Sequence, residues 1–360
     1  MVLDSKAVNS RRRTSHVDRN LPALSCLVAA LLFGASTPAS KALLSSTGPL
    51  TLAGLLYLGG ALAVLPLSFR GGSAQLRREP KQRGMLALAV LFGGGIGPVV
   101  MLFGLKAASA ASVSLWLNTE TVATAVLAWA LFHEHLDRRT VIAIALVLAG
   151  GLLLAAPEGA AGWRAGALVA IACFCWGLDN NLTALISGFT PAQTTAIKGV
   201  VAGTVNLTLG IALEGRTPGV GPIAAALAVG AFSYGFSIML YISGAQQLGA
   251  SRSQLIFSTS PFLGVLLAWT LLGEPVRLFQ VGAAVAMVAG LIFMLTARHE
   301  HEHSHEATHH THAHRHDDGH HDHAHPGIPA RVRHTHPHHH SPITHSHPHA
   351  PDIHHRHGHD

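Results

Sequence analysis

Apolar stretches of about 20 residues recur between residues 21 and 297, and they restrict the fold more than any other feature. Buried strands of soluble proteins are shorter, at roughly 4–8 residues. Within lipid every backbone polar group needs an internal partner, which a helix provides. We therefore predict an all-α integral membrane protein with about ten transmembrane helices, near 22–44, 49–69, 84–105, 111–132, 139–156, 165–187, 192–213, 222–244, 254–272 and 279–297.

Composition agrees with this interpretation. Only 12% of the residues are charged, whereas soluble domains carry roughly 25%. The formal net charge is +6, but the basic residues do not form an aromatic-interleaved patch, so we predict no nucleic-acid partner. The three cysteines lie in apolar segments and imply no disulfide framework.

The placement of Lys and Arg predicts the topology. Basic residues outside the spans concentrate on alternate connections, which marks those connections as cytoplasmic. The opposite side carries only Lys106, Arg164, Arg216 and Arg277. With an even number of helices, both termini are then cytoplasmic. We expect a multi-pass protein of the bacterial inner membrane, in contact with the lipid bilayer, and a homodimer is one possible assembly.

The chain also contains an internal repeat. Residues 109–136 and 249–276 align without gaps at an offset of 140, including Trp129 with Trp269 and Glu134 with Glu274. Each half holds about five helices, an odd number, so the second half inserts with inverted orientation. The predicted domains are an N-terminal segment 1–20, a first repeat 21–157, a second repeat 163–297 and a tail 298–360.

The motif Leu-Ala-Trp-x-Leu-x-x-Glu at 127–134 and 267–274 resembles the drug/metabolite transporter superfamily, specifically the ten-helix proteins built from two EamA repeats. Phe33-Gly34 and Trp176-Gly177 fit the same family. The resemblance implies secondary transport but leaves the substrate open, since members move amino acids, nucleotide precursors, drugs and other solutes. No Walker A loop is present, and we predict no enzymatic activity and no required cofactor.

The tail beyond residue 298 differs from the rest of the chain in its high histidine content. Of the 28 histidines, all but His16, His133 and His135 lie beyond residue 298. With few apolar residues, the tail is predicted to be disordered. Imidazole binds Ni²⁺, Co²⁺ and Zn²⁺, although affinity does not select among metals. The predicted ligands are His299, His301, His303, His305, His320, His321, His323, His325, His338, His339, His340, His354, His355, His357 and His359.

Ionisable residues within predicted spans often mark a transport path. Asp179 and Lys198 lie equally far from the turn that joins their helices, so they can form an ion pair at one depth. Glu120 has no such partner in its own hairpin and can carry a proton or bind a divalent cation. The predicted pathway residues are Asn118, Glu120, Asp179, Asn180, Asn181 and Lys198. Asn180 and Asn181, which adjoin Asp179, either line the path or bridge helices.

Other polar groups have simpler roles. Glu134 and Glu274 recur in both repeats and are expected to cap or anchor helix ends, although His133 and His135 offer an alternative entry site. Lys41 is expected to extend toward the membrane interface.

Three functions remain open. The first is proton-coupled export of nickel or cobalt, because the chain is similar to histidine-tailed superfamily members linked to resistance to these ions. The second is export of a small organic solute, with a tail that only buffers or senses metal. The third is a metal sensor or store that does not transport.

Overall fold

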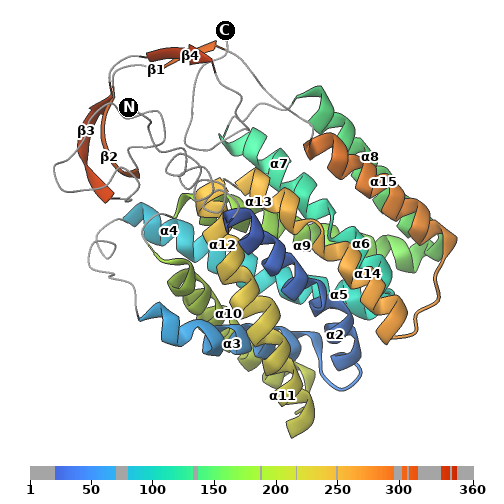
Figure 1. Cartoon of the computed structure of the whole chain (residues 1–360). Coiled ribbons are helices and arrows are strands. Elements are labelled where there is room, and N and C mark those ends of the chain that lie inside the picture. Colours follow the sequence, from blue (N-terminus) through green and yellow to red (C-terminus); the bar gives the residue numbers. More distant parts are fainter. Residues whose placement is uncertain are drawn as a thin grey trace, which may run out of the picture. The chain divides into compact units, whose positions relative to one another are not determined.

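The computed structural model describes residues 21–69, 80–132, 137–186, 189–215, 217–248 and 250–295, together with four short strands between 302 and 346. Residues 1–297 and 298–360 form two separate units. The first unit is a helical bundle (Figure 1), and each of the ten predicted segments coincides with helix, so the prediction of an all-α membrane protein is confirmed.

The bundle contains a helix Leu21–Leu43 whose second part is α2 (Ser36–Leu43), then α3 (Pro49–Ser68), α4 (Pro80–Ala89), η2 (Val90–Ile96), α5 (Gly97–Ala107), α6 (Ala110–Trp116), α7 (Thr119–Phe132), α8 (Arg138–Ala155), η3 (Ala156–Glu158), α9 (Gly159–Leu185), α10 (Pro191–Glu214), α11 (Val220–Val229), η4 (Gly230–Phe236), α12 (Ser237–Leu248), α13 (Ala250–Phe257), α14 (Ser260–Leu271) and α15 (Leu278–Leu295).

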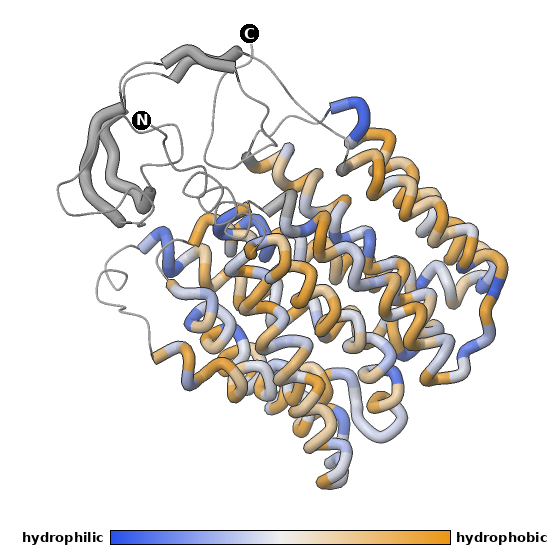
Figure 2. Tube along the Cα trace, in the orientation of Figure 1, coloured by the Kyte–Doolittle hydropathy of each residue, from blue (hydrophilic) through white to orange (hydrophobic). Residues whose placement is uncertain are grey.

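Within the described residues, seven helical stretches are long and apolar enough to cross a membrane. One of them, Arg138–Leu185, covers two predicted spans, which are joined through η3 and Gly159 at a φ of +59°. The predicted span 111–132 is divided between α6 and α7, and Leu278–Met294 is a shorter apolar helix. Figure 2 shows hydrophobic residues along the helices and hydrophilic ones mainly near their ends. Exposed leucines and valines on the bundle surface provide its contact with lipid.

The packing of α8 against α15 shows how the repeats are related (Figure 1). Gly150 faces Ala283 and Met287, while Gly290 faces Ala143 and Val147. The two contacts are equivalent at the repeat offset of 140 residues, because Ala143 and Val147 of α8 correspond to Ala283 and Met287 of α15, and Gly150 corresponds to Gly290. Exchange of the two repeats therefore maps this interface onto itself, as expected for a pseudo-two-fold axis between inverted halves.

Two π-helical segments, which the sequence analysis did not predict, occupy equivalent positions in the repeats. η2 begins at Val90 and η4 begins at Gly230, again 140 residues apart. η2 packs against α10, and η4 packs against α3. Such segments frequently occur at functional sites because they interrupt the regular hydrogen-bond ladder of the helix.

In the tail, which we expected to lack regular structure, the structure contains four strands. β1 (Glu302–His305) pairs antiparallel with β4 (Ile343–Ser346), and β2 (Thr308–His314) pairs antiparallel with β3 (His334–His340). Over much of these segments histidines alternate with small or polar residues. This alternation matches the two-residue period of side chains along a strand. Other predicted tail ligands lie outside the described residues: His299, His301, His320, His321, His323, His325, His354, His355, His357 and His359.

Candidate functional site

Asp179 and Lys198 form the ion pair that the sequence suggested. Lys198 Nζ, on α10, lies 2.5 Å from Asp179 Oδ2, on α9. Thr183 donates a hydrogen bond to the second carboxylate oxygen at 3.0 Å. Both charged side chains are buried, where an unpaired charge would cost free energy. Each of them neutralises the charge of the other. A capping box of Thr190 and Gln193 starts α10 and fixes the hairpin that brings the pair together.

Glu120, in the first turn of α7, is buried among neutral groups. In the described part of the chain, no Lys, Arg or His nitrogen lies within 4 Å of its carboxylate. Its hydrogen-bond partner comes from another hairpin, since Asn180 Nδ2 donates to Glu120 Oε1 at 2.8 Å. Gln254 Oε1 lies 3.2 Å from the same amide nitrogen and accepts a 2.9 Å bond from the Tyr241 hydroxyl. These four residues, from α7, α9, α12 and α13, constitute the Glu120 cluster.

The two remaining predicted pathway residues lie elsewhere. Asn181 donates to the backbone oxygens of Thr124 and Gly177, so it bridges α9 and α7. Asn118 donates to Leu115 O and contacts Met287 Sδ at 3.7 Å, which directs it toward α15. Asn181 therefore bridges two helices, which is one of the two roles expected for it, and the pathway role of both asparagines stays a prediction.

The π-helical segment η2 forms one wall beside the ion pair. Gly93 O accepts bonds from the Tyr57 hydroxyl at 2.5 Å and from Trp176 Nε1 at 3.0 Å. Asn206 Nδ2 donates to Gly94 O at 3.1 Å. These side chains pair with carbonyl groups of the interrupted helix. A side chain at Gly93 would overlap Asp179, so glycine here allows the close approach of η2 and α9.

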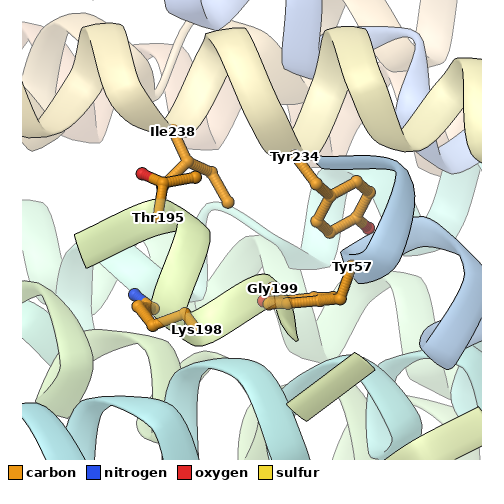
Figure 3. Close-up of a pocket in the computed structure, with 6 residues that line it drawn as sticks. All are labelled: Tyr57, Thr195, Lys198, Gly199, Tyr234 and Ile238. Atoms are coloured by element: carbon orange, nitrogen blue, oxygen red, sulfur yellow. The ribbon is translucent and has the colours of Figure 1, made fainter. Parts of the chain in front are cut away.

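A narrow cavity lies where α3, α10, η4 and α12 meet, with room for a water-sized molecule. Figure 3 shows the residues that line it: Tyr57, Thr195, Lys198, Gly199, Tyr234 and Ile238. The rings of Tyr57 and Tyr234 are 5.3 Å apart. Asn180, which bonds to Glu120, adjoins Asp179 on α9, and Lys198 lines the cavity, so the pair, the cavity and the Glu120 cluster form one polar region.

Tyr57, Tyr234, Tyr241 and Gln254 belong to the polar region but were not predicted from the sequence. The tyrosines could have been noticed because the chain has only three. All three lie in this region, Tyr57 and Tyr234 at the cavity and Tyr241 in the Glu120 cluster. Gln254 gave no comparable signal, because an uncharged polar residue near a predicted helix end is common.

The described residues of the bundle do not gather metal ligands. Among them there is no group of three or more His, Cys, Asp or Glu side chains that could hold a metal ion. His133, Glu134 and His135, the predicted alternative entry site, lie outside the described residues. The predicted capping role of Glu274 is observed, since its carboxylate accepts bonds from Ala110 N and Ala111 N at 2.7 and 2.9 Å. Lys41 donates to Leu105 O and Ala108 O at the end of α5, and its extension toward the interface stays a prediction.

Comparison with known proteins identifies similar chains. The sequence pattern of the EamA-like transporter family matches residues 20–156 and again 163–296. An uncharacterized transporter of Methanothermobacter thermautotrophicus is 28% identical over 294 residues, covering 75% of this chain and 85% of the relative. The uncharacterized transporter YyaM of Bacillus subtilis is 24% identical over 250 residues, covering 65% and 80%. A solved crystal structure shares the fold with a TM-score of 0.58 at 19% identity, covering 76% of this chain and 94% of the other.

Proposed function

Since the chain belongs to the EamA-like transporter family, we propose that it is a proton-coupled secondary exporter of a small organic cation. Both termini are cytoplasmic in this proposal, and the second repeat is inverted relative to the first. Transport proceeds by rocking of the two repeats about the polar region between them.

The observation that carries the proposal is the charge balance of that region. Lys198 neutralises Asp179, whereas Glu120 meets only neutral hydrogen-bonding groups among the described residues. A carboxylate isolated from water favours either a proton or a bound cation. Because one site cannot hold both at once, binding of a proton releases the cation. This competition couples the two fluxes in opposite directions.

The surroundings favour an organic cation over a metal ion. Phe33 lies 5.2 Å from Phe257 and 5.5 Å from Tyr234 between ring centroids, and Tyr241 lies 4.9 Å from Phe257. Aromatic faces attract cations and accommodate apolar substituents. Divalent metals instead require several strong ligands, and Glu120 is accompanied by amides and a tyrosine.

Export of nickel or cobalt is the second candidate, and the histidine-rich tail supports it. Histidine is a good ligand for both ions and for Zn²⁺. In this alternative the tail collects metal and delivers it to the core. If the tail only buffers or senses metal, its removal leaves transport by the core intact.

The test is transport by proteoliposomes that contain the full chain, with an imposed proton gradient, followed by uptake of labelled cation and by the internal pH, because exchange of one proton for one monovalent cation moves no net charge. Primary amines and quaternary ammonium ions are compared with Ni²⁺, Co²⁺ and Zn²⁺. Gradient-driven uptake of organic cations that disappears in Glu120→Gln but persists in Glu214→Gln supports the proposal. Glu214 is the matched control because its carboxylate caps α3 at Leu50 and Thr51, away from the polar region.

Uptake of metals alone establishes the second candidate instead. Truncation after Ala297 then separates the tail from the core, since loss of metal uptake in the truncated chain assigns delivery to the tail. Absence of uptake with every ion overturns both candidates.

A further inference from the structure

Five buried hydroxyl groups in one part of the bundle have no hydrogen-bond partner among the described residues. They belong to Ser36, Ser40, Thr47, Ser114 and Tyr234, each at most 5% exposed. Buried hydroxyls normally find partners, since leaving one unpaired costs free energy. Serine and threonine in helices commonly bond to a carbonyl of the preceding turn, as Thr119 and Ser258 do here. None of the five forms such a local bond; the hydroxyls of Ser36 and Tyr234 face each other, and those of Ser40, Thr47 and Ser114 are available to a water or a solute.

We call these five residues the hydroxyl seam; α2, which carries Ser36 and Ser40, packs against both α6 and α14. Ser36 and Ser40 are one turn apart on the buried face of α2. Tyr234, on η4, lies beside Ser36. Ser114, on α6, meets Gly264 at the point where Gly264 also contacts Gly34. The seam therefore runs between α2, α6, α14 and η4, which come from both repeats.

The two ends of the hydroxyl seam differ. At one end, Tyr234 borders the cavity that also contains Lys198 and Tyr57 (Figure 3). At the other end, Thr47 follows α2. The seam thus connects the central polar region with the end of the bundle that carries Lys41.

At that end, groups from both repeats hold the turn between α5 and α6. Lys41 Nζ donates to Leu105 O and Ala108 O at 2.8 and 2.7 Å. Glu274, at the end of the second repeat's α14, accepts from Ala110 N and Ala111 N. Gln280, on α15, donates to the hydroxyls of Ser109 and Ser112 at 3.3 and 3.2 Å. A movement of one repeat against the other must break the bonds of Glu274 and Gln280, whereas those of Lys41 lie within the first repeat.

We propose that the hydroxyl seam is the route between the central region and this side of the membrane, closed by the contacts of Lys41 and Glu274 with the α5–α6 turn. The inference rests on the proposed transport function and specifies one half of its path. Hydroxyl oxygens accept hydrogen bonds from water and from ammonium groups, so the seam suits a hydrated or amine-bearing cation. Opening of the turn admits water to groups that are unpaired in the closed state.

Thiol accessibility tests the route without knowledge of the cargo. Cys26, Cys173 and Cys175 are first replaced by Ala in the full chain. Ser36→Cys and Ser40→Cys are then compared with Ala35→Cys, which lies beside Ser36 but is exposed on the outer surface of the bundle. The probe is a membrane-impermeant methanethiosulfonate, applied to whole cells and to inverted vesicles.

We expect the two seam thiols to react at least ~10-fold faster than the Ala35→Cys control from one side only, because thiolates form in water and not in lipid. Adding Glu274→Ala is expected to raise the Ser40→Cys rate about tenfold further, whereas Glu214→Ala, which removes a similar helix cap on α3, leaves the rate unchanged. Unreactive seam thiols under all conditions, or equal effects of the two glutamate variants, overturn the proposal.

The outcome is separable from that of the proposed function. Reactive seam thiols without organic-cation uptake retain the route and refute the cargo. Organic-cation uptake with unreactive seam thiols retains the cargo and refutes the route. Expression and monodispersity of each variant exclude misfolding as the reason for a low rate.

Discussion

Two carboxylates on neighbouring elements of the core differ in their charge balance. Asp179 is paired with Lys198, and its second oxygen is bonded to Thr183. Glu120 is bonded to Asn180, the residue next to Asp179, and its partners within the described residues are neutral. The first cluster is complete within the protein, whereas the second retains a charge that a proton or a ligand can neutralise. Equal burial therefore does not imply equal function, and substitutions should separate the two.

The largest expected effect is the loss of transport in Glu120→Gln. Glutamine keeps the shape and can still accept the bond from Asn180, but it cannot exchange a proton for a cation. We expect flux to fall to background while the thermal unfolding midpoint in detergent stays the same or rises, because a buried charge has been removed. A strongly lowered midpoint would instead assign Glu120 a structural role.

Substitution within the Asp179–Lys198 ion pair should lower stability, in contrast to Glu120→Gln. Lys198→Met leaves Asp179 buried and unpaired, and we expect a loss of about 3–5 kcal/mol in the free energy of unfolding. The double variant Asp179→Asn with Lys198→Met should recover most of that loss. Chemical denaturation of the three proteins measures the difference. No recovery in the double variant would show that the pair does more than neutralise charge.

The π-helical segment offers a matched pair of glycine substitutions. In Gly93→Ala the new methyl group would overlap Asp179, and we expect a loss of about 1–3 kcal/mol through displacement of the ion pair. Gly95→Ala, on the same segment, meets nothing closer than Val90 O at 3.7 Å among the described residues, so a change below about 0.5 kcal/mol is expected. Similar losses in both variants would mean that η2 tolerates no side chain at all.

The smallest effect is expected for Tyr241→Phe. This change removes the hydroxyl that donates to Gln254 and leaves the ring in place. The lost bond joins two protein groups, and a neutral hydrogen bond contributes about 1 kcal/mol to stability, so the free energy of unfolding should fall by about that amount. Chemical denaturation of the two proteins measures the loss. An unchanged stability would show that this bond does not help to hold the Glu120 cluster together.

Much of the architecture follows from the order of the amino acids. The apolar stretches specified helices, and the 140-residue repeat implied inverted halves. The equal spacing of Asp179 and Lys198 from their turn correctly suggested an ion pair. The same reasoning predicted Asn118 and Asn181 on the path, which stays a prediction, while their amide nitrogens bond to backbone oxygens and to Met287 Sδ on α15. Sequence position gives the depth of a residue in a span but not the helix it faces.

The sequence by itself determined the class of fold, because a segment of apolar residues in lipid has few stable alternatives to a helix. It also determined that charge inside the bundle is rare and therefore informative. Only the tertiary structure decided which charges are neutralised and that the three tyrosines lie in one polar region. It also decided that Glu274 caps a helix of the other repeat and that η2 and η4 occupy matching positions. These features depend on contacts between segments far apart in the chain, and such contacts follow from how the helices pack rather than from the period of any one of them.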